Sequence, residues 1–262
     1  MTSGAIGLQR EGAVATVLID NPDKLNALTV AMWQQLAVVM QQVSADDAVR
    51  CVVLRGAGEQ AFAAGADIAE FATLRNNAAQ GEVYHREWVY GALRAVGDCR
   101  HPTVAMIYGP CVGGGLELAC QCDLRIAATS ARFGVPINRL GFAIAYDELA
   151  AVLPLVGRAV ALELLVEGRV WCAEEAAAKG LLTRLVSDAA LATETAASVA
   201  RIVAGAPLVA RWHKQMIRRL TPAPQPLTDA ERRANFDYFA TADYRIGYDA
   251  FLAKQTPRFT GR

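Results

Sequence analysis

A carboxylate, Glu117, closely follows three consecutive glycines in the segment CVGGGLE at 111–117. The apolar residues before the glycines predict a strand, and LELACQC at 116–122 predicts a helix. At such a turn, glycine lets backbone N–H groups approach a ligand, and the helix dipole favours negative charge. The turn lacks GxGxxG and the Lys and Ser/Thr of a P-loop, which favours an oxyanion over a phosphate. A tight turn, with Glu117 stabilising its own helix, would explain the same residues without catalysis.

A second turn of small residues lies upstream, in FAAGADIAEF at 62–71. It follows a strand candidate at 51–56, Gly65 predicts a tight turn, and Asp67 predicts an N-cap for the next helix. Two such turns could direct two N–H groups at one carbonyl oxygen and stabilise it as an enolate. One well-placed donor typically contributes about 3 kcal/mol in a transition state.

Strand and helix patterns alternate over the first part of the chain and predict an α/β fold. The strand candidates are 13–20, 51–56, 103–109, 123–128, a short segment around 132–133, and 183–187. The helix candidates are 28–44, with Thr29 as N-cap, 83–96 and 158–167. From about residue 188 only helical patterns occur, broken by a proline-rich loop at 221–226. We therefore expect an α/β core over 1–187 and an all-helical region over 188–262.

The composition argues against several classes of protein. Lys plus Arg and Asp plus Glu both number 26, so no net charge attracts nucleic acid or an anionic membrane. The basic segment 211–220 is expected to be a solvated helix face. The apolar stretch 149–168 contains Pro154, Arg158 and Glu163, which predicts two packed helices rather than a membrane span.

The six cysteines form no CxxC pair, and the amino terminus shows no charged region followed by an apolar run. These features predict buried, reduced cysteines in a cytoplasmic protein without a metal site.

Together the two glycine-containing stretches resemble the crotonase family, the enoyl-CoA hydratase and isomerase group. The motifs are FAAGADI at 62–68, HPTVAMIYGPCVGGGLELACQCDLRIAA at 101–128 and ARFGVPINRLG at 131–141. The likeness also includes 168–186 and 239–254, so that it covers nearly the whole chain from residue 22 onward.

The resemblance implies a crotonase-like spiral of ββα turns with an all-helical C-terminal region that helps form trimers, which often pair into hexamers. The substrate is implied to be an acyl-CoA thioester, so coenzyme A arrives with the substrate and no separate cofactor is expected. By motif position, Ala66 and Gly114 supply the oxyanion-hole N–H groups, and Glu117 is the first catalytic glutamate.

The resemblance also implies which residues contact coenzyme A. They are Ala64, Asp67 and Ile68 near the adenine end, Lys24 and Leu25 on the same wall, and Lys254 at the nucleotide, usually from a neighbouring subunit.

The sequence departs from the family where a second glutamate follows the proline of FGxPE. Here Ile137 follows Pro136, and isoleucine cannot transfer a proton. Asp147 or Glu148 could reach into the acyl pocket, but a solvent-facing first turn of their helix is the expected arrangement for both. His85 falls near the acyl pocket of relatives and could help shape it, although a surface histidine is the default expectation.

Several functions stay open at this point. Hydration normally uses two acids around one water, whereas double-bond isomerisation needs one base and decarboxylation of a malonyl-type thioester needs chiefly the oxyanion hole. A protein that binds CoA thioesters without turnover is another alternative. Nucleic-acid binding is disfavoured because the helix at 29–44 has no lysine or arginine.

Overall fold

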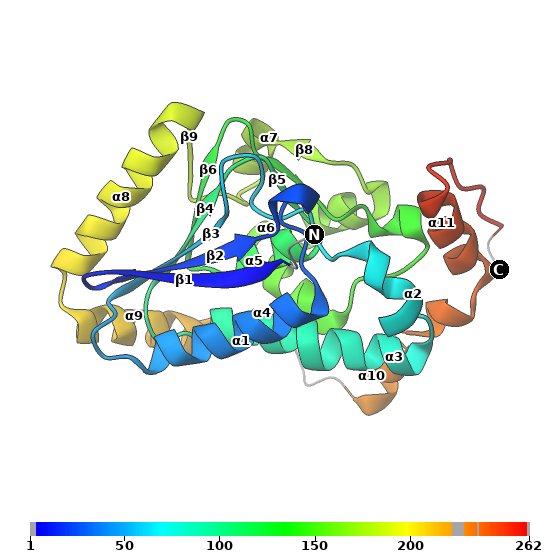
Figure 1. The fold of residues 1–262 in the computed structure, drawn as a ribbon, viewed down its shortest axis with the longest axis horizontal. Helices are drawn as coiled ribbons and strands as arrows, with labels where there is room; N and C mark the ends of the chain where they lie inside the picture. Colours follow the sequence, from blue (N-terminus) through cyan, green and yellow to red (C-terminus); the bar gives the residue numbers. More distant parts are fainter. Residues whose placement is uncertain (1–3, 222–227, 235, 261–262) are drawn as a thin grey trace.

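The computed structural model describes residues 4–221, 228–234 and 236–260. Six strands form a twisted main sheet in the order β1-β2-β3-β4-β6-β9, in which β1 pairs antiparallel with β2 and every other pair is parallel (Figure 1). The strands are β1 (Ala5–Glu11), β2 (Val14–Asp20), β3 (Cys51–Gly56), β4 (Thr103–Ile107), β6 (Leu124–Ala128) and β9 (Arg184–Val186). A smaller sheet joins β5 (Pro110–Val112), β7 (Arg132–Gly134) and β8 (Trp171–Cys172).

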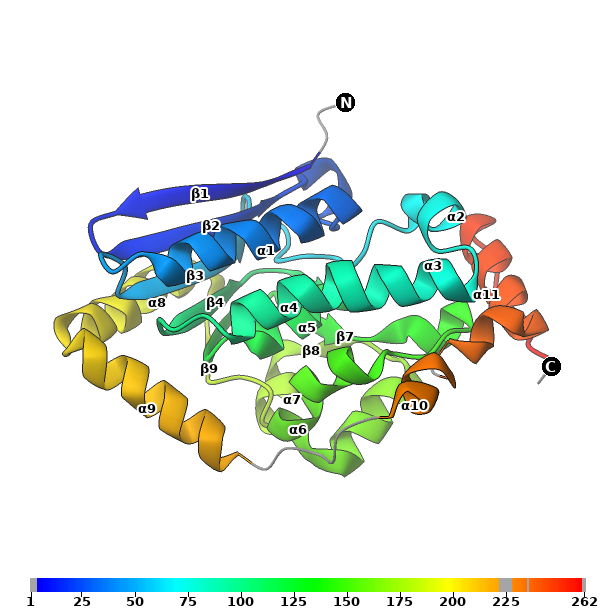
Figure 2. The same ribbon diagram turned by 90° about the horizontal axis from the view of Figure 1, so that it is seen from below.

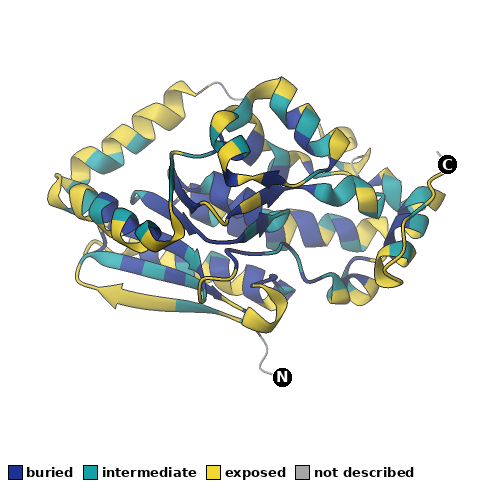
Figure 3. Cartoon of the chain, turned by 90° about the horizontal axis from the view of Figure 1, so that it is seen from above, coloured by how far each residue is buried: buried dark blue, intermediate teal, exposed yellow. Residues whose placement is uncertain are grey.

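Burial explains which strands the sequence predicts well. The central strands β3 and β4 are buried on both faces and read as continuous apolar runs, as expected of parallel strands between helices (Figure 3). The edge strand β1 is largely exposed, and β5 and β8 are only three and two residues long. The sequence does not predict β1 and β8, because neither carries a strong apolar signal. In contrast, β5 is the strand predicted directly before the glycines.

Helices cover both faces of the main sheet. On one side, α1 packs against α4 and α5 packs against α4 and α6. The elements of this part are α1 (Val30–Ala45), α2 (Phe71–Leu74), α3 (Ala78–Val83), η3 (Tyr84–Val89), α4 (Tyr90–Gly97), α5 (Gly114–Gln121), α6 (Tyr146–Glu167) and α7 (Ala173–Ala178), with short 3₁₀ turns η1 (Pro22–Lys24), η2 (Ile68–Glu70) and η4 (Pro136–Leu140). Thr29 caps α1 as predicted, since its hydroxyl accepts the Met32 N–H.

The helix expected at 83–96 contains a widened turn. Residues Tyr84–Val89 form a π-helical turn, η3, between α3 and α4. Such turns occur frequently at functional sites. Here the turn carries two buried polar side chains, Tyr84 and His85.

The described residues after 187 are helical or loop, and they lie at two ends of the molecule (Figure 2). The elements are α8 (Asp188–Ala204), α9 (Pro207–Leu220), α10 (Asp229–Ala234), η5 (Asp237–Ala240) and α11 (Ala242–Leu252). Helix α8 packs on β3, β4, β6 and β9, whereas α11 contacts η4 and η5 beside α2 and α3. The predicted division into 1–187 and 188–262 stays a prediction, and residues 222–226 of the proline-rich loop lie outside the described residues.

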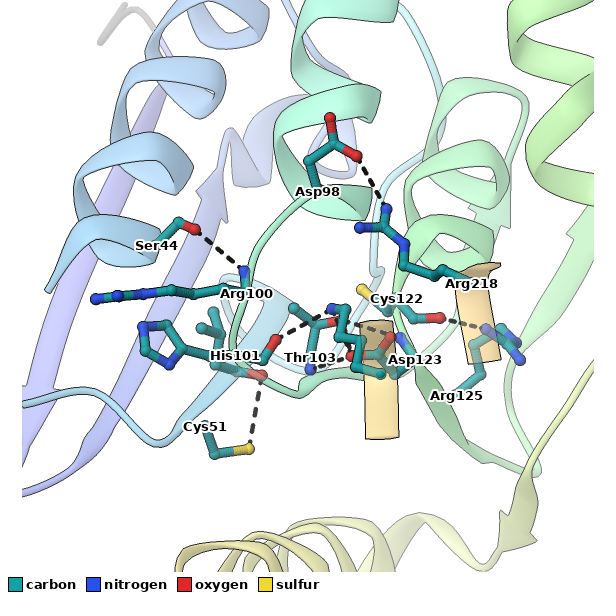
Figure 4. A network of polar contacts seen from close by, with 12 residues as sticks. Ser44, Cys51, Asp98, Arg100, His101, Thr103, Cys122, Asp123, Arg125 and Arg218 are labelled. Atoms are coloured by element: carbon teal, nitrogen blue, oxygen red, sulfur yellow. Dashed lines mark hydrogen bonds and ion pairs between the residues drawn. The ribbon is translucent and has the colours of Figure 1, made fainter. Parts of the chain in front are cut away.

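The basic face of α9 is solvated only in part: Arg218 and Arg219 are exposed as expected, whereas Arg211 and Lys214 are half-buried. Lys214 donates to Asp123 at 2.7 Å, Arg218 to Asp98 at 3.0 Å and Arg211 to Asp47 at 3.2 Å. Figure 4 shows this region, in which Thr103 also binds Asp123 and Ser44 accepts the Arg100 N–H. The basic side chains therefore attach α9 to the α/β core.

Among the described helices, α6 alone is long and apolar enough to cross a membrane by length and composition. Its backbone leaves helical geometry at Gly157, where φ is 74° and ψ is 170°. The expectation of two helical segments is thus confirmed. The cysteines are buried as expected, except that Cys172 is exposed.

Candidate active site

A cavity of about 730 Å³ lies where the two glycine-containing turns meet η3, η4 and the start of α6. The C-terminal segment after α11 also borders it. Its wall is mostly apolar. The buried titratable side chains that line it are Arg75, Tyr84, His85, Glu117 and Glu148, and the exposed Arg139 also borders it. The sequence predicts Glu117 as catalytic and offers Glu148 and His85 as candidates. Arg75 was not predicted.

The two predicted turns lie side by side at this cavity. A Cβ atom placed on Gly65 would lie 3.1 Å from the Val112 carbonyl oxygen and 3.8 Å from the Gly114 nitrogen. Bridges from Ala66 to Leu28 and from Ala63 to Cys111 hold the first turn in place. Throughout the described part of the chain, no acceptor pairs with the backbone N–H of Ala66 or of Gly114. Both residues line the cavity, so two unpaired donors are available there.

At each of the three consecutive glycines a side chain is disfavoured, for a different steric reason. Gly113 has a φ of +52°, which side chains rarely adopt. A Cβ on Gly114 would lie 2.9 Å from the Trp33 ring, and one on Gly115 would lie 2.3 Å from the Ala63 carbonyl oxygen. The run therefore lets the first turn of α5 pack directly on the other loop.

Glu117 lies in the first turn and a half of α5 and is only 4% exposed. Its carboxylate lies beside Gly114, since a Cβ on that glycine would be 3.8 Å from Oε2. Burial, together with the nearby Glu148 carboxylate, raises the pKa of Glu117 well above the ordinary value, against the opposing charge of Arg75. The protonated form of Glu117 is therefore favoured relative to that of an exposed glutamate.

A second acid, Glu148, reaches the same cavity from the first turn of α6. It is 4% exposed, and its Oε1 is hydrogen-bonded to Nδ1 of His85. Its Oε2 accepts the Ala145 N–H at 3.3 Å. The expectation of a solvent-facing Glu148 is wrong, because η3 brings His85 over the start of α6 and gives the carboxylate a buried partner.

The neighbouring acid serves as a contrast. Asp147 points away from the cavity and pairs with Arg232 at 2.6 Å. His85 is also not a surface residue, contrary to the default expectation, while His213 is exposed. The successive positions 147 and 148 thus carry one surface ion pair and one buried acid of the cavity.

The surroundings of the Glu148–His85 pair shift the pKa of each member and so define its charge. Burial would raise the pKa of Glu148, but the His85 ring, Arg75 and the Ala145 N–H together lower it. Burial lowers the pKa of His85, which outweighs the raising effect of Glu148. We therefore describe the pair as an ionised Glu148 that accepts Nδ1–H from a neutral imidazole. The buried His85 Nε2 has no protein partner in the described residues, so its lone pair is free.

The comparisons with known proteins agree with this geometry. A family model for enoyl-CoA hydratase/isomerase matches residues 9–262. A probable enoyl-CoA hydratase of Mycobacterium tuberculosis is 34% identical over 265 residues that cover 100% of both chains. The chain belongs to the enoyl-CoA hydratase/isomerase family.

Solved structures in this family share the fold. An enoyl-CoA hydratase/carnithine racemase from Magnetospirillum magneticum is 50% identical with a TM-score of 0.82, covering 98% of this chain and 96% of the other. A methylmalonyl-CoA decarboxylase is 26% identical with a TM-score of 0.87, covering 98% of each chain. The expected crotonase-like α/β fold is confirmed, and the chain is an acyl-CoA enzyme of this family.

Within the family framework, Ile137 marks the position of the expected second glutamate. Ile137 lines the cavity, whereas Asn138 beside it donates to the Val166 carbonyl at 2.9 Å. The cavity therefore has an apolar side chain at 137 and the Glu148–His85 pair on another wall.

The residues expected at coenzyme A fall into two groups. Ala64 and Ile68 line the cavity. The other four lie outside its wall, and they are Lys24, Leu25, Asp67 and Lys254. Lys24 and Asp67 form an ion pair at 2.6 Å, and Asp67 also caps η2 as predicted. Their contact with coenzyme A stays a prediction.

Proposed function

We propose that this protein adds water to the double bond of an enoyl-CoA thioester, with Glu117 as acid and the Glu148–His85 pair as base. The observation that carries the proposal is the buried Glu148–His85 pair, which lines the same cavity as Glu117. Two titratable groups whose environments push their pKa values apart are the usual basis for dividing acid and base roles.

The proposed hydration uses the groups as follows. The Ala66 and Gly114 N–H groups hold the thioester oxygen. His85 Nε2 takes a proton from water as the water oxygen bonds to Cβ, and the π electrons move onto the thioester oxygen as an enolate.

The enolate then collapses, and Cα takes the proton of Glu117. The product has gained one water, and a proton returns from His85 to Glu117 to restore the site. Glu148 holds the imidazole in the required tautomer and stabilises it when it becomes charged.

Mass spectrometry in ¹⁸O-labelled water tests this proposal with crotonyl-CoA and a 3-enoyl-CoA. We expect crotonyl-CoA to gain one labelled water. Conversion of the 3-enoyl substrate alone, without added water, would instead establish a one-acid isomerase. Loss of carbon dioxide from a malonyl-type thioester, with no hydration, would establish a decarboxylase, and bound but unchanged thioester would establish a binding role.

Adjacent positions supply matched variants. Glu148→Gln is expected to lower kcat by about 10²- to 10³-fold, because the imidazole loses its orienting charge. Asp147→Asn changes the neighbouring acid, which faces Arg232, and is expected to alter kcat by no more than about twofold. Equal effects of the two variants would contradict a catalytic role for Glu148.

The proposal includes self-association. Helix α9 exposes Trp212, Met216, Ile217 and Leu220 on the side opposite its ion pairs. A second copy covering this face, in a homotrimer or a pair of trimers, would remove that apolar surface from water. We further propose a cytoplasmic enzyme whose only coenzyme A is that of its substrate. Sedimentation equilibrium tests the oligomer, and a monomer would contradict it.

A further inference from the structure

Arg75 is the strongest unexplained feature of the cavity. Its side chain lines the cavity and is 1% exposed. No carboxylate oxygen in the described residues lies within 4.0 Å of its guanidinium nitrogens. A buried charge without a counterion in direct contact is costly in a folded protein. The ionised Glu148 offsets part of this cost from a distance, and the N–H donors of Arg75 still lack a carboxylate in contact.

Aromatic rings hold the guanidinium in a fixed plane. Its central carbon lies 4.0 Å from the Phe142 ring centroid and 4.5 Å from that of Phe71. Tyr84, Tyr238 and Phe239 lie farther out, at 5.8 to 6.0 Å. Cation–π contacts of this kind stabilise the charge, but a ring supplies no lone-pair acceptor for the N–H donors.

Several N–H donors of the guanidinium have no acceptor among the described residues. A guanidinium carries five N–H donors, and one of its nitrogens, Nη2, donates to the Tyr238 hydroxyl at 2.7 Å. In the described residues, Nε is buried without an acceptor, and Nη1 has no acceptor either. Nη1 and Nη2 together form the end-on edge of the guanidinium, and Nη2 keeps a second N–H besides the one given to Tyr238. This edge matches a carboxylate, which accepts two parallel N–H bonds.

Arg75 does not belong to the immediate surroundings of the two turns. The atoms nearest to a Cβ placed on Gly65 or Gly114 come from Val112, Trp33, Glu117 and the facing turn itself, and none comes from Arg75. The rings around Arg75 come instead from α2, η3, η5 and the loop before α6. With the thioester oxygen at the turns, Arg75 is therefore placed to meet the acyl chain away from its carbonyl.

We infer that Arg75 binds a carboxylate at the far end of the acyl group, so that the preferred substrates are CoA thioesters of dicarboxylic acids. The inference rests on the proposed function in one respect, namely that the cavity holds the acyl part of an acyl-CoA. It adds the chemical class of that acyl group.

A structural role for Arg75 makes a different prediction. The Tyr244 hydroxyl donates to the Arg75 carbonyl oxygen at 3.2 Å, and Tyr238 accepts from the side chain, so Arg75 also holds η5 and α11. If that were its whole purpose, its replacement would affect all acyl-CoA ligands alike. A carboxylate-binding role changes the preference between charged and uncharged ligands.

Binding of unreactive, saturated ligands tests the inference without turnover. Isothermal titration calorimetry would compare glutaryl-CoA with 5-methylhexanoyl-CoA, in which an isopropyl group replaces the carboxylate at similar size. Acetyl-CoA serves as the reference without a far end. For the wild-type protein we expect glutaryl-CoA to bind at least about 10-fold more tightly than its uncharged counterpart.

Arg75→Gln is expected to abolish that preference while leaving acetyl-CoA affinity within about twofold. Tyr238→Phe is the matched control, since it removes the protein hydrogen bond of Arg75 and keeps both the ring and the charge. This variant is expected to keep the preference. Circular dichroism checks that each variant is folded.

The outcomes separate the two proposals. If wild-type protein binds acetyl-CoA but prefers the uncharged ligand or neither, the Arg75 inference is wrong and the proposed function stands. If it binds none of the three ligands, the proposed function itself fails. If Arg75→Gln does not fold, the wild-type preference alone decides, because a ten-fold preference for the dicarboxylic ligand supports the inference and its absence overturns it.

Discussion

In the proposed function, the two ends of the cavity recognise the ligand by different means. At the thioester end, defined by Gly65, Ala66, Gly113 and Gly114, the donors are backbone N–H groups. At the acyl end, defined by Arg75, His85 and Glu148, the groups are side chains from α2, η3 and α6. A backbone site depends on chain geometry and tolerates few changes, whereas a side-chain site can be altered one residue at a time.

This difference explains how a family fold can keep one partial reaction and vary the rest. Enolate stabilisation needs only donors near the carbonyl oxygen, whichever acyl group is attached. Proton transfer and acyl recognition depend on side chains that sit elsewhere on the wall. This chain illustrates the separation, because it has the apolar Ile137 at one position of the wall and the buried Glu148–His85 pair at another.

Glu117 lies between the two ends, and its loss is expected to have the largest effect. Glu117→Gln keeps the shape and removes the acid, so kcat for crotonyl-CoA hydration should fall by about 10³-fold or more in a stopped-flow absorbance assay. The control is Glu87→Gln. Glu87 lies in η3, which also carries the cavity-lining His85, but its own side chain is exposed. Retention of more than a tenth of the activity would remove Glu117 from the mechanism.

The same variant should be more stable than wild type. Because the folded-state pKa of Glu117 is raised, the folded protein binds a proton that the unfolded chain has already lost above its ordinary pKa. Stability is therefore lost as pH rises, by about 1.4 kcal/mol per unit until the folded pKa is reached. We expect the Tm advantage of Glu117→Gln to grow as pH rises above the ordinary carboxyl range and to level off above the folded-state pKa. An advantage that stays constant with pH would contradict a raised pKa.

The acyl end should control the acidic limb of the pH profile. Hydration requires His85 as a neutral base, so activity falls as pH drops through the lowered pKa of the pair, and it falls at high pH as Glu117 ionises. His85→Gln is expected to lower kcat by about 10²-fold and to remove the acidic limb. His213→Gln, at an exposed position, should leave the bell-shaped profile unchanged.

The thioester end should respond to backbone crowding. Gly115→Ala would place a methyl group 2.3 Å from the Ala63 carbonyl oxygen, which forces the two turns apart. We expect a loss of about 1–3 kcal/mol in the free energy of unfolding, as for overpacked sites, together with lower kcat. Urea titration provides the measurement.

Gly12→Ala is the matched control for that substitution. Unlike Gly115, Gly12 has a positive φ, and a Cβ there has nothing within 4 Å, so Gly12→Ala adds backbone strain without crowding. A small effect on stability with unchanged kcat is expected for Gly12→Ala. Equal losses of activity in both variants would show that the turns need no close contact.

The two ends also differ in how far the sequence predicts them. The thioester end consists of contiguous motifs in which glycine positions, a strand and a helix follow one another, so Gly65, Gly114 and Glu117 could be placed together in advance. Glu148 and His85 are 63 positions apart, and each looks like a surface residue on its own segment. Their pairing depends on how η3 crosses the start of α6, which no local pattern encodes.

The same reasoning accounts for the fold. Strands β3 and β4 were predicted because both faces are buried, while the exposed β1 and the two-residue β8 carry no comparable signal. Arg75 was not anticipated because its aromatic neighbours come from separate parts of the chain. Residues that depend on distant partners are the ones that a single sequence leaves open.

The smallest effect is expected outside the cavity, at the Lys24–Asp67 pair. Lys24 is largely exposed and is not among the residues that line the cavity. Its proposed role is therefore to attract the phosphates of coenzyme A rather than to act on the acyl group. Lys24→Met should raise KM a few-fold at low salt, leave kcat unchanged, and lose its effect as salt screens the charge. Arg94→Met, at an exposed cation paired with Asp98, should change neither constant. If Lys24→Met instead lowers kcat while KM stays constant, the charge acts on the reacting end of the substrate, and the separation of the wall into nucleotide, thioester and acyl regions would have to be redrawn.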